Sequence, residues 1–142
     1  MHLPRKTPRA VLAVAVAAGF AIPAFADLPQ PQPKHHGAIT YVSGGIGLSE
    51  QHALEAEAHR YNLAITNANK AGDFTVDTAL VIREKNGHAV LRVADTGPLF
   101  YAKLPAGDYV IHAMNDGQKR TQEVKIASNR ATDVHLIWSQ NG

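Results

Sequence analysis

The sequence predicts a mainly β protein, a seven-stranded antiparallel β-sandwich with one N-terminal α-helix. Beyond Asn62, short runs of alternating apolar and polar residues recur at intervals of about 10 to 13 residues, as in a sandwich. Turns that contain glycine or asparagine separate these runs. Before Asn62, only residues 49–61 have helical spacing. We therefore expect a sandwich over residues 62–142, preceded by a Gly-loop and helix extension over residues 38–61.

The first 26 residues have the pattern of a secretory signal peptide. Basic residues precede an apolar run over residues 10–22, and residues 24–26 (Ala-Phe-Ala) form the small-x-small pattern that signal peptidase accepts. The run is shorter than the about 20 apolar residues of a membrane-spanning helix. We expect cleavage between Ala26 and Asp27, and a mature protein without a membrane anchor in the periplasm or secreted.

Cleavage would also change the charge of the chain. The full sequence has 14 basic and 12 acidic residues, and the signal peptide contains three of the basic ones, which leaves 11 against 12. A net charge of −1 and the lack of a basic run give no electrostatic footprint for nucleic acid. Because the chain has no cysteine, neither a disulfide nor a lipid-modified cysteine is possible.

The segment from the predicted cleavage site to the first strand is rich in proline. Residues 27–37 (DLPQPQPKHHG) contain three prolines at alternate positions, which predicts an extended, mobile leader. A short strand is predicted over 38–42. The following SGGIG motif is predicted to be a loop, because three glycines in five positions would cost a regular element too much entropy.

The predicted helix over residues 49–61 begins with Ser49, a preferred N-cap residue. At 100° per residue, Leu54, Ala58 and Tyr61 form a narrow apolar stripe. We expect this stripe to pack against the rest of the protein.

The predicted strands of the sandwich alternate in and out of a core. The final strand places Val134, Leu136 and Trp138 on one face, so Trp138 is predicted to lie in the core. The seven predicted strands are 63–67, 75–83, 88–94, 99–104, 109–114, 118–126 and 132–138.

Three turns have characteristic residues. Asn86-Gly87 and Asp116-Gly117 each predict a type I′ hairpin turn, which needs positive φ at both central positions. The corner Leu104-Pro105-Ala106-Gly107-Asp108 predicts a type II turn, with Pro105 fixing φ and Gly107 supplying a positive φ.

The same corner carries a resemblance to a known family. Leu104, Pro105, Gly107 and Tyr109 match the Leu-Pro-x-Gly-x-Tyr corner of the carboxypeptidase regulatory-like domain, and residues 63–138 resemble it in strand pattern. This resemblance implies a prealbumin-like (transthyretin-like), Ig-like sandwich with an accessory binding role. The YVSGGIG motif and the helix also resemble a small group of exported proteobacterial proteins. The related 5-hydroxyisourate hydrolases end in Tyr-Arg-Gly-Ser, whereas this chain ends IWSQNG.

One group of side chains could bind a metal ion. His52, Glu55 and His59 share one side of the predicted helix and are suitable ligands for Zn²⁺ or Cu²⁺, with His35 and His36 able to complete the set. Alternatively, these side chains simply face solvent, because they lie opposite the apolar stripe. Positions i and i+7 are about 10.5 Å apart along a helix, which makes Glu55 and His59 the more compact pair.

The remaining motifs have structural interpretations. His112 and His135 lie on predicted strands, where histidine usually faces solvent or is hydrogen-bonded inside. The SGGIGLSE loop lacks the spacing of a phosphate-binding motif, and Glu50 would repel an anion. No arrangement typical of a serine hydrolase is present.

We therefore expect an exported, non-catalytic binding or interaction module without a cofactor, monomeric or weakly self-associating. Its partner would be a protein or small molecule of the cell envelope. A periplasmic metal-binding protein is the alternative, and a transthyretin-like hydrolase of small molecules is the third possibility.

Overall fold

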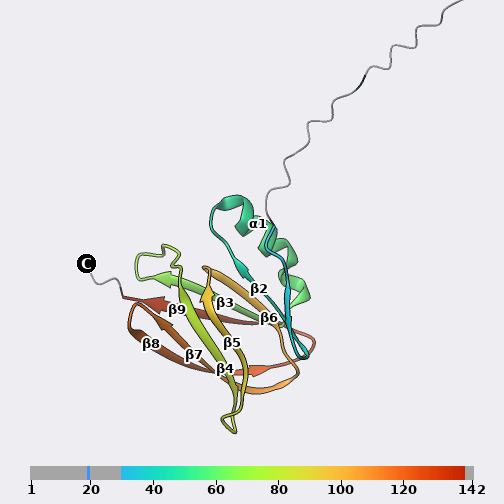
Figure 1. Cartoon of the computed structure of the whole chain (residues 1–142), viewed down its shortest axis with the longest axis vertical. Helices are drawn as coiled ribbons and strands as arrows, with labels where there is room; N and C mark the ends of the chain where they lie inside the picture. Colours follow the sequence, from blue (N-terminus) through green and yellow to red (C-terminus); the bar gives the residue numbers. More distant parts are fainter. Residues whose placement is uncertain (1–18, 20–29, 140–142) are drawn as a thin grey trace, which may run out of the picture.

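The computed structural model describes residues 19 and 30–139, which form a two-sheet β-sandwich with one helix outside it (Figure 1). The predicted fold class is confirmed. The predicted signal peptide, apart from Gly19, and its cleavage site lie outside the described residues. The elements are β1 (Lys34–His36), β2 (Ile39–Gly44), α1 (Leu48–Glu57), the 3₁₀ helix η1 (Ala58–Arg60), β3 (Leu63–Asn69), β4 (Thr78–Glu84), β5 (Ala89–Thr96), β6 (Leu99–Lys103), β7 (Gly107–Asn115), β8 (Gln118–Ile126) and β9 (Thr132–Trp138).

The core lies between the two sheets and follows from the alternation of the strands. Val134, Leu136 and Trp138 of β9 are buried, whereas His135 and Ile137 between them are exposed. Trp138 is 2% exposed, which confirms its predicted place in the core.

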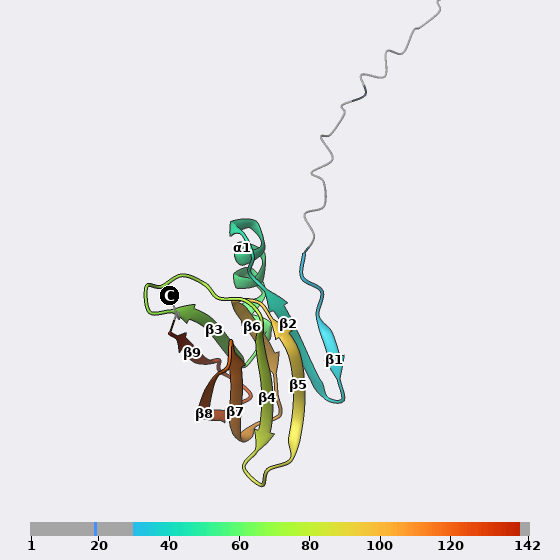
Figure 2. The same ribbon diagram turned by 60° about the vertical axis from the view of Figure 1, so that its left-hand side comes forward.

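Within residues 30–139 the sandwich has nine strands instead of seven, because the five-stranded sheet extends further toward the N-terminus. This sheet has the order β1-β2-β6-β3-β9, and the other has the order β5-β4-β7-β8. β2 pairs with β6 along its length below the helix, and β1 pairs with β2 around a turn at Gly37, whose φ is 58° (Figure 2). The prediction of a mobile leader is therefore wrong for Lys34–His36, and the prediction that residues 38–61 lie outside the sandwich is wrong for β2.

The reason for this extension is that β2 is apolar on both faces. Ile39 contributes to the main core between the sheets, and Val42 contributes to a second apolar cluster under the helix. Alternation alone identifies a strand with one buried face, but a short strand buried on both sides has no such pattern.

One strand pair departs from the predicted antiparallel arrangement. β3 and β9 pair in parallel, from Leu63 opposite Thr132 to Asn69 opposite Trp138. Parallel pairing needs a long connection between the two strands. Here the chain forms β4 and β5 of the second sheet, β6 of the first, and β7 and β8 of the second before it reaches β9.

Asn62, immediately before β3, joins three strands of the five-stranded sheet through buried hydrogen bonds. Its Nδ2 donates to the Leu104 carbonyl (2.7 Å), and its Oδ1 accepts from the Leu104 N–H (2.8 Å). Its backbone N–H donates to the carbonyl of Ala102 (3.1 Å), and its backbone carbonyl accepts from the N–H of Thr132 (2.9 Å). Because Asn62 is only 4% exposed, these bonds replace ones that water would otherwise make.

A second buried asparagine lies further along β3. Asn67 is fully buried, and its Oδ1 accepts a hydrogen bond from Nε1 of Trp138 (3.2 Å). Its backbone N–H donates to the carbonyl of Pro98 (2.8 Å). This asparagine therefore satisfies the one polar atom of the core tryptophan.

The two predicted type I′ turns differ in the structure. Asp116 and Gly117 both have positive φ (47° and 75°), which confirms that prediction. In the other turn only Gly87 has positive φ (95°), and its N–H donates to the Glu84 carbonyl across Lys85 and Asn86 (2.9 Å). The type I′ prediction is wrong there, because that loop is one residue longer and needs a single left-handed residue at its end.

The predicted type II turn at Gly107 is also wrong. Gly107 is not among the residues with positive φ and is the first residue of β7. The corner is held by Tyr109, whose hydroxyl donates to the carbonyl of Pro105 (2.6 Å). A cross-corner side-chain bond, and not a glycine conformation, therefore closes this reversal.

Replacing Asn62 should strongly destabilise the protein. Asn62→Ala leaves the buried N–H and carbonyl of Leu104 without partners, and we expect a loss of about 2 to 4 kcal/mol in the free energy of unfolding by urea. Asn129→Ala, at an exposed turn position, is the matched control and should change it by less than about 0.5 kcal/mol. Equal effects of the two substitutions would contradict the role given to Asn62.

The corner can be tested with three substitutions. Tyr109→Phe should cost about 1 kcal/mol by removing the bond to Pro105. Gly107→Ala should cost less than about 0.5 kcal/mol, because an added Cβ would lie 3.6 Å from its nearest neighbour in ordinary contact. Gly117→Ala, at a left-handed position, should cost about 1 kcal/mol or more. A large effect of Gly107→Ala would restore the type II interpretation.

Candidate binding site beside the helix

The helix begins one residue earlier than predicted and without the predicted cap. Gly47, with φ 85°, is the N-cap residue, and no side chain caps the helix. The Ser49 N-cap prediction is therefore wrong. Instead, Oε1 of Glu50 accepts a hydrogen bond from the N–H of Gly45 (2.9 Å), and Nε2 of Gln51 donates to the carbonyl of Gly45 (3.0 Å).

These bonds give the glycine loop a structural role, as the sequence predicted. Glu50 supplies the negative group at the start of the helix, so the loop holds its own carboxylate where a phosphate-binding loop would hold an anion. Gly97 passes so close to Gly44 that an added Cβ would lie 2.5 Å from the Gly44 carbonyl oxygen. The glycines therefore allow the loop to pack closely against the turn before β6.

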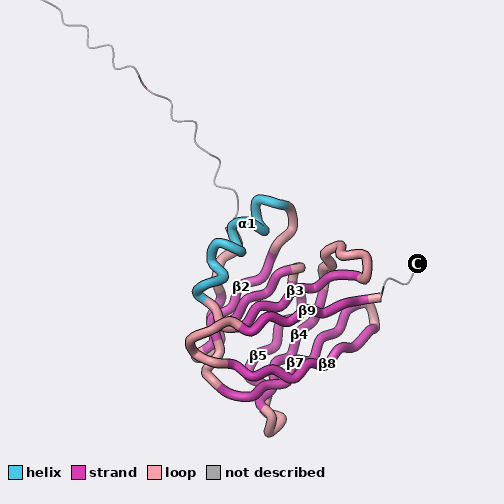
Figure 3. The backbone as a smooth tube through the Cα atoms, turned by 180° about the vertical axis from the view of Figure 1, so that it is seen from behind, coloured by secondary structure: helices cyan, strands magenta, loops and turns pink. Residues whose placement is uncertain are grey.

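The helix packs against the outer face of the five-stranded sheet, on the side away from the main core (Figure 3). Leu54 and Tyr61 are 2% and 8% exposed, with Ala58 packed beside them, which confirms the predicted apolar stripe. The rings of Tyr61 and Tyr101 stack with their centres 6.0 Å apart. Residues Val42, Leu54, Tyr61, Leu99 and Tyr101 form this second cluster.

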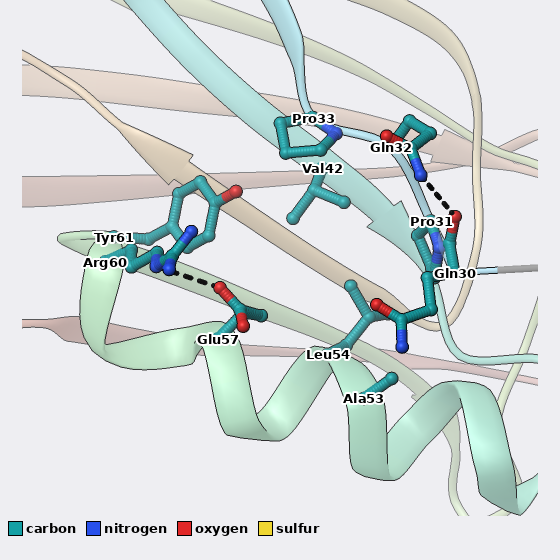
Figure 4. Close-up of a pocket in the computed structure, with 10 residues that line it drawn as sticks. All are labelled: Gln30, Pro31, Gln32, Pro33, Val42, Ala53, Leu54, Glu57, Arg60 and Tyr61. Atoms are coloured by element: carbon teal, nitrogen blue, oxygen red, sulfur yellow. Dashed lines mark hydrogen bonds and ion pairs between the residues drawn. The ribbon is translucent and has the colours of Figure 1, made fainter.

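A cleft of about 190 Å³ opens between the helix and the segment that leads into β1. Val42, Leu54 and Tyr61 form its apolar floor, and residues 30–33 form the opposite wall (Figure 4). We call this cleft, lined by Gln30, Pro31, Gln32, Pro33, Val42, Ala53, Leu54, Glu57, Arg60 and Tyr61, the helix cleft.

The rim of the helix cleft is polar. Glu57 and Arg60 form an exposed ion pair one helical turn apart, with Oε2 and Nε separated by 2.9 Å. Such an exposed pair contributes little to stability, and it places one negative and one positive group at the rim. On the other wall, Nε2 of Gln32 donates to the carbonyl of Gln30 (3.3 Å).

The tyrosines beneath the helix keep their hydroxyl groups protonated at neutral pH. Burial raises the pKa of Tyr61, and the negative charge of Glu57 raises it further, while Arg60 opposes this effect. Burial also raises the pKa of Tyr101, with smaller contributions from Glu55 and Asp133. The cleft therefore offers neutral aromatic surface next to a compensated ion pair.

The residues of the predicted metal site lie on the exposed side of the helix. All three are exposed: His52, Glu55 and His59. Nδ1 of His59 lies 3.0 Å from the carbonyl oxygen of Ala56, one helical turn earlier. His35 and His36 are on β1, where Nδ1 of His35 lies 3.0 Å from Oγ1 of Thr40.

Within residues 19 and 30–139, no three histidine, aspartate or glutamate side chains are grouped so that they could hold a metal ion. The structure therefore does not bring the proposed ligands of Zn²⁺ or Cu²⁺ together. Metal binding stays a prediction. His112 and His135 are both exposed, which agrees with the structural interpretation of these strand histidines.

Sequence reasoning missed the helix cleft because its walls come from separate segments. Helical spacing predicts the apolar stripe of the helix, but the residues of β2 predict only a short strand outside the sandwich and do not indicate its contact with the helix. Proline at alternate positions of residues 29–33 signals an extended segment, yet it does not indicate where that segment lies.

Comparisons with known proteins identify no family. No protein-family model matches this chain, and no curated protein matches it. Similar solved structures include the Bacillus anthracis TIE protein, with 18% identity and a TM-score of 0.43, and BcpA, the major pilin subunit of Bacillus cereus, with 20% identity and a TM-score of 0.39. Each match covers 54% of this chain, which spans 16% of the first protein chain and 28% of the second.

The carboxypeptidase regulatory-like resemblance of residues 104–109 stays a prediction.

Among residues 19 and 30–139, no helix is both long and apolar enough to span a membrane.

The packing of the helix can be tested separately from that of the sandwich. Leu54→Ala should cost about 2 kcal/mol, because it leaves a cavity in the small cluster under the helix. Hydrogen exchange should show faster exchange at the amides of α1, with those of β7 unchanged. His52→Ala, on the exposed side of the same helix, is the control. Uniformly faster exchange in both sheets would show that the helix is not a separate layer.

Proposed function

We propose that this protein is an exported, non-catalytic binding module that holds a partner segment or small molecule of the cell envelope in the helix cleft. The observation that carries this proposal is the composition of the cleft. Its floor is apolar and its rim is polar, a combination that binds a ligand by burial and orients it by a few polar contacts.

Two further features support a binding role over a catalytic one. The ionisable side chains at the rim, Glu57 and Arg60, are paired with each other, so neither is poised to exchange a proton with a ligand. Next to the start of the helix, Ile46 and Leu48 are 68% and 71% exposed and add apolar surface for a partner. The signal-like pattern of residues 1–26 supports export.

Site-specific photo-crosslinking in living cells tests this function. A photoreactive phenylalanine analogue at Ala53, which lines the helix cleft, should give a discrete crosslinked product. The same analogue at Thr121, on the exposed face of β8, is the matched control and should not give that product. Excess exported protein without the analogue should compete and reduce the yield.

Two outcomes would contradict the proposal. The first is no crosslinked product from Ala53 in cells that export the protein normally. The second is the same product from Ala53 and Thr121, because contact across the whole surface does not identify a site.

A further inference from the structure

A second cleft lies on the other side of the helix end and is rich in positive charge. It has a volume of about 310 Å³ and lies where η1, the end of β6 and the loop between β8 and β9 meet. Arg60 comes from η1, Lys103 ends β6, and Ser128, Asn129 and Arg130 come from the loop. We call it the basic cleft.

The charge of the basic cleft is unbalanced. Three of its lining residues, Arg60, Lys103 and Arg130, are positively charged at neutral pH, His59 is a fourth basic side chain, and none of the lining residues is acidic. Glu57 pairs with Arg60. In the described part of the chain, Lys103 and Arg130 form no ion pair. Two cations therefore face one cavity without a compensating carboxylate.

Stability of the helix does not explain why Lys103 and Arg130 line the cleft. Basic residues at the end of a helix interact favourably with its dipole, which accounts for His59 and Arg60. Lys103 and Arg130 belong to a strand end and a loop, outside any helix. Like charges on one cleft repel each other, and an anion bound between them would offset this repulsion.

The side chains present are those that recognise oxygen anions. A guanidinium group donates two parallel hydrogen bonds to a phosphate, sulfate or carboxylate, and an ammonium group adds a point charge. The hydroxyl of Ser128 and the carboxamide of Asn129 are further donors in the same loop.

We propose that the basic cleft binds an oxyanionic group, a phosphate, sulfate or carboxylate, through Lys103 and Arg130. Lys103 and Arg130 do not line the helix cleft, so this site goes beyond the function proposed above. The group can belong to a soluble molecule or to the headgroup of an anionic lipid.

The first test is titration of the exported, isotope-labelled protein with inorganic phosphate at constant ionic strength, followed by ¹H–¹⁵N NMR. We expect saturable shifts confined to the amides of residues 103 and 128–131. The double variant Lys103→Gln, Arg130→Gln should bind phosphate at least about tenfold more weakly, because two charge-assisted bonds are lost. Both side chains are exposed, and unchanged urea unfolding would verify that the variant folds.

The control removes the same charge elsewhere. Arg92 and Lys119 are exposed residues of β5 and β8, and Arg92→Gln, Lys119→Gln should leave phosphate affinity within about twofold. No saturable shift, or an equal loss in both double variants, would overturn the proposal. An equal loss would mean that phosphate affinity depends only on the overall charge of the protein.

The second test distinguishes the two sources of the anion. Vesicles of phosphatidylglycerol are compared with vesicles of phosphatidylcholine by co-sedimentation. Binding to the anionic vesicles that disappears in Lys103→Gln, Arg130→Gln assigns the site to a lipid headgroup. Saturable phosphate binding without vesicle binding assigns it to a soluble oxyanion. Vesicle binding that persists in this variant would overturn the role of the basic cleft in lipid recognition.

Discussion

The buried carboxamide of Asn62 is the constraint on which the arrangement of the other elements depends. It bonds to both polar groups of the Leu104 backbone, while its own backbone bonds to Ala102 and Thr132. One residue therefore connects the start of β3 to the end of β6 and the start of β9. Tyr61, the preceding residue, is carried by the same anchor into the cluster under the helix. This anchor therefore lies where the end of the helix meets the sheet, next to both clefts.

The five-stranded sheet differs from an ordinary outer layer of a sandwich because it is apolar on both faces. Antiparallel sheets commonly bury one face and expose the other to water. Here Val42, Leu99 and Tyr101 form an apolar patch on the outer face, and they are buried in one cluster with Leu54 and Tyr61. Two clefts border this cluster, one with an apolar floor and one lined by cations. Arg60 and Tyr61 line both, so the end of the helix divides two surfaces of different chemistry.

The turns show how far local sequence determines backbone conformation. Asp116-Gly117 adopts the conformation that its residues favour, because the strands on either side leave a loop of two residues. Asn86-Gly87 has the same chemistry, but the pairing of β4 with β5 sets a longer loop and leaves one left-handed residue. At Gly107 the decisive group is the hydroxyl of Tyr109, two residues later in the chain. A turn motif therefore predicts a reversal more reliably than it predicts the type of turn.

The sequence by itself determined the class of fold, the core face of β9 and the apolar stripe of the helix. These features depend on periodicity, which is a property of neighbouring residues. Only the tertiary structure decided the parallel pairing of β3 with β9, the place of β1 and β2 in the sheet, and the bonds of Asn62. It also decided that Lys103 and Arg130, in a near-neutral chain without a basic run, face one cavity. These features join residues far apart in the chain, and periodicity contains no information about which distant segments meet.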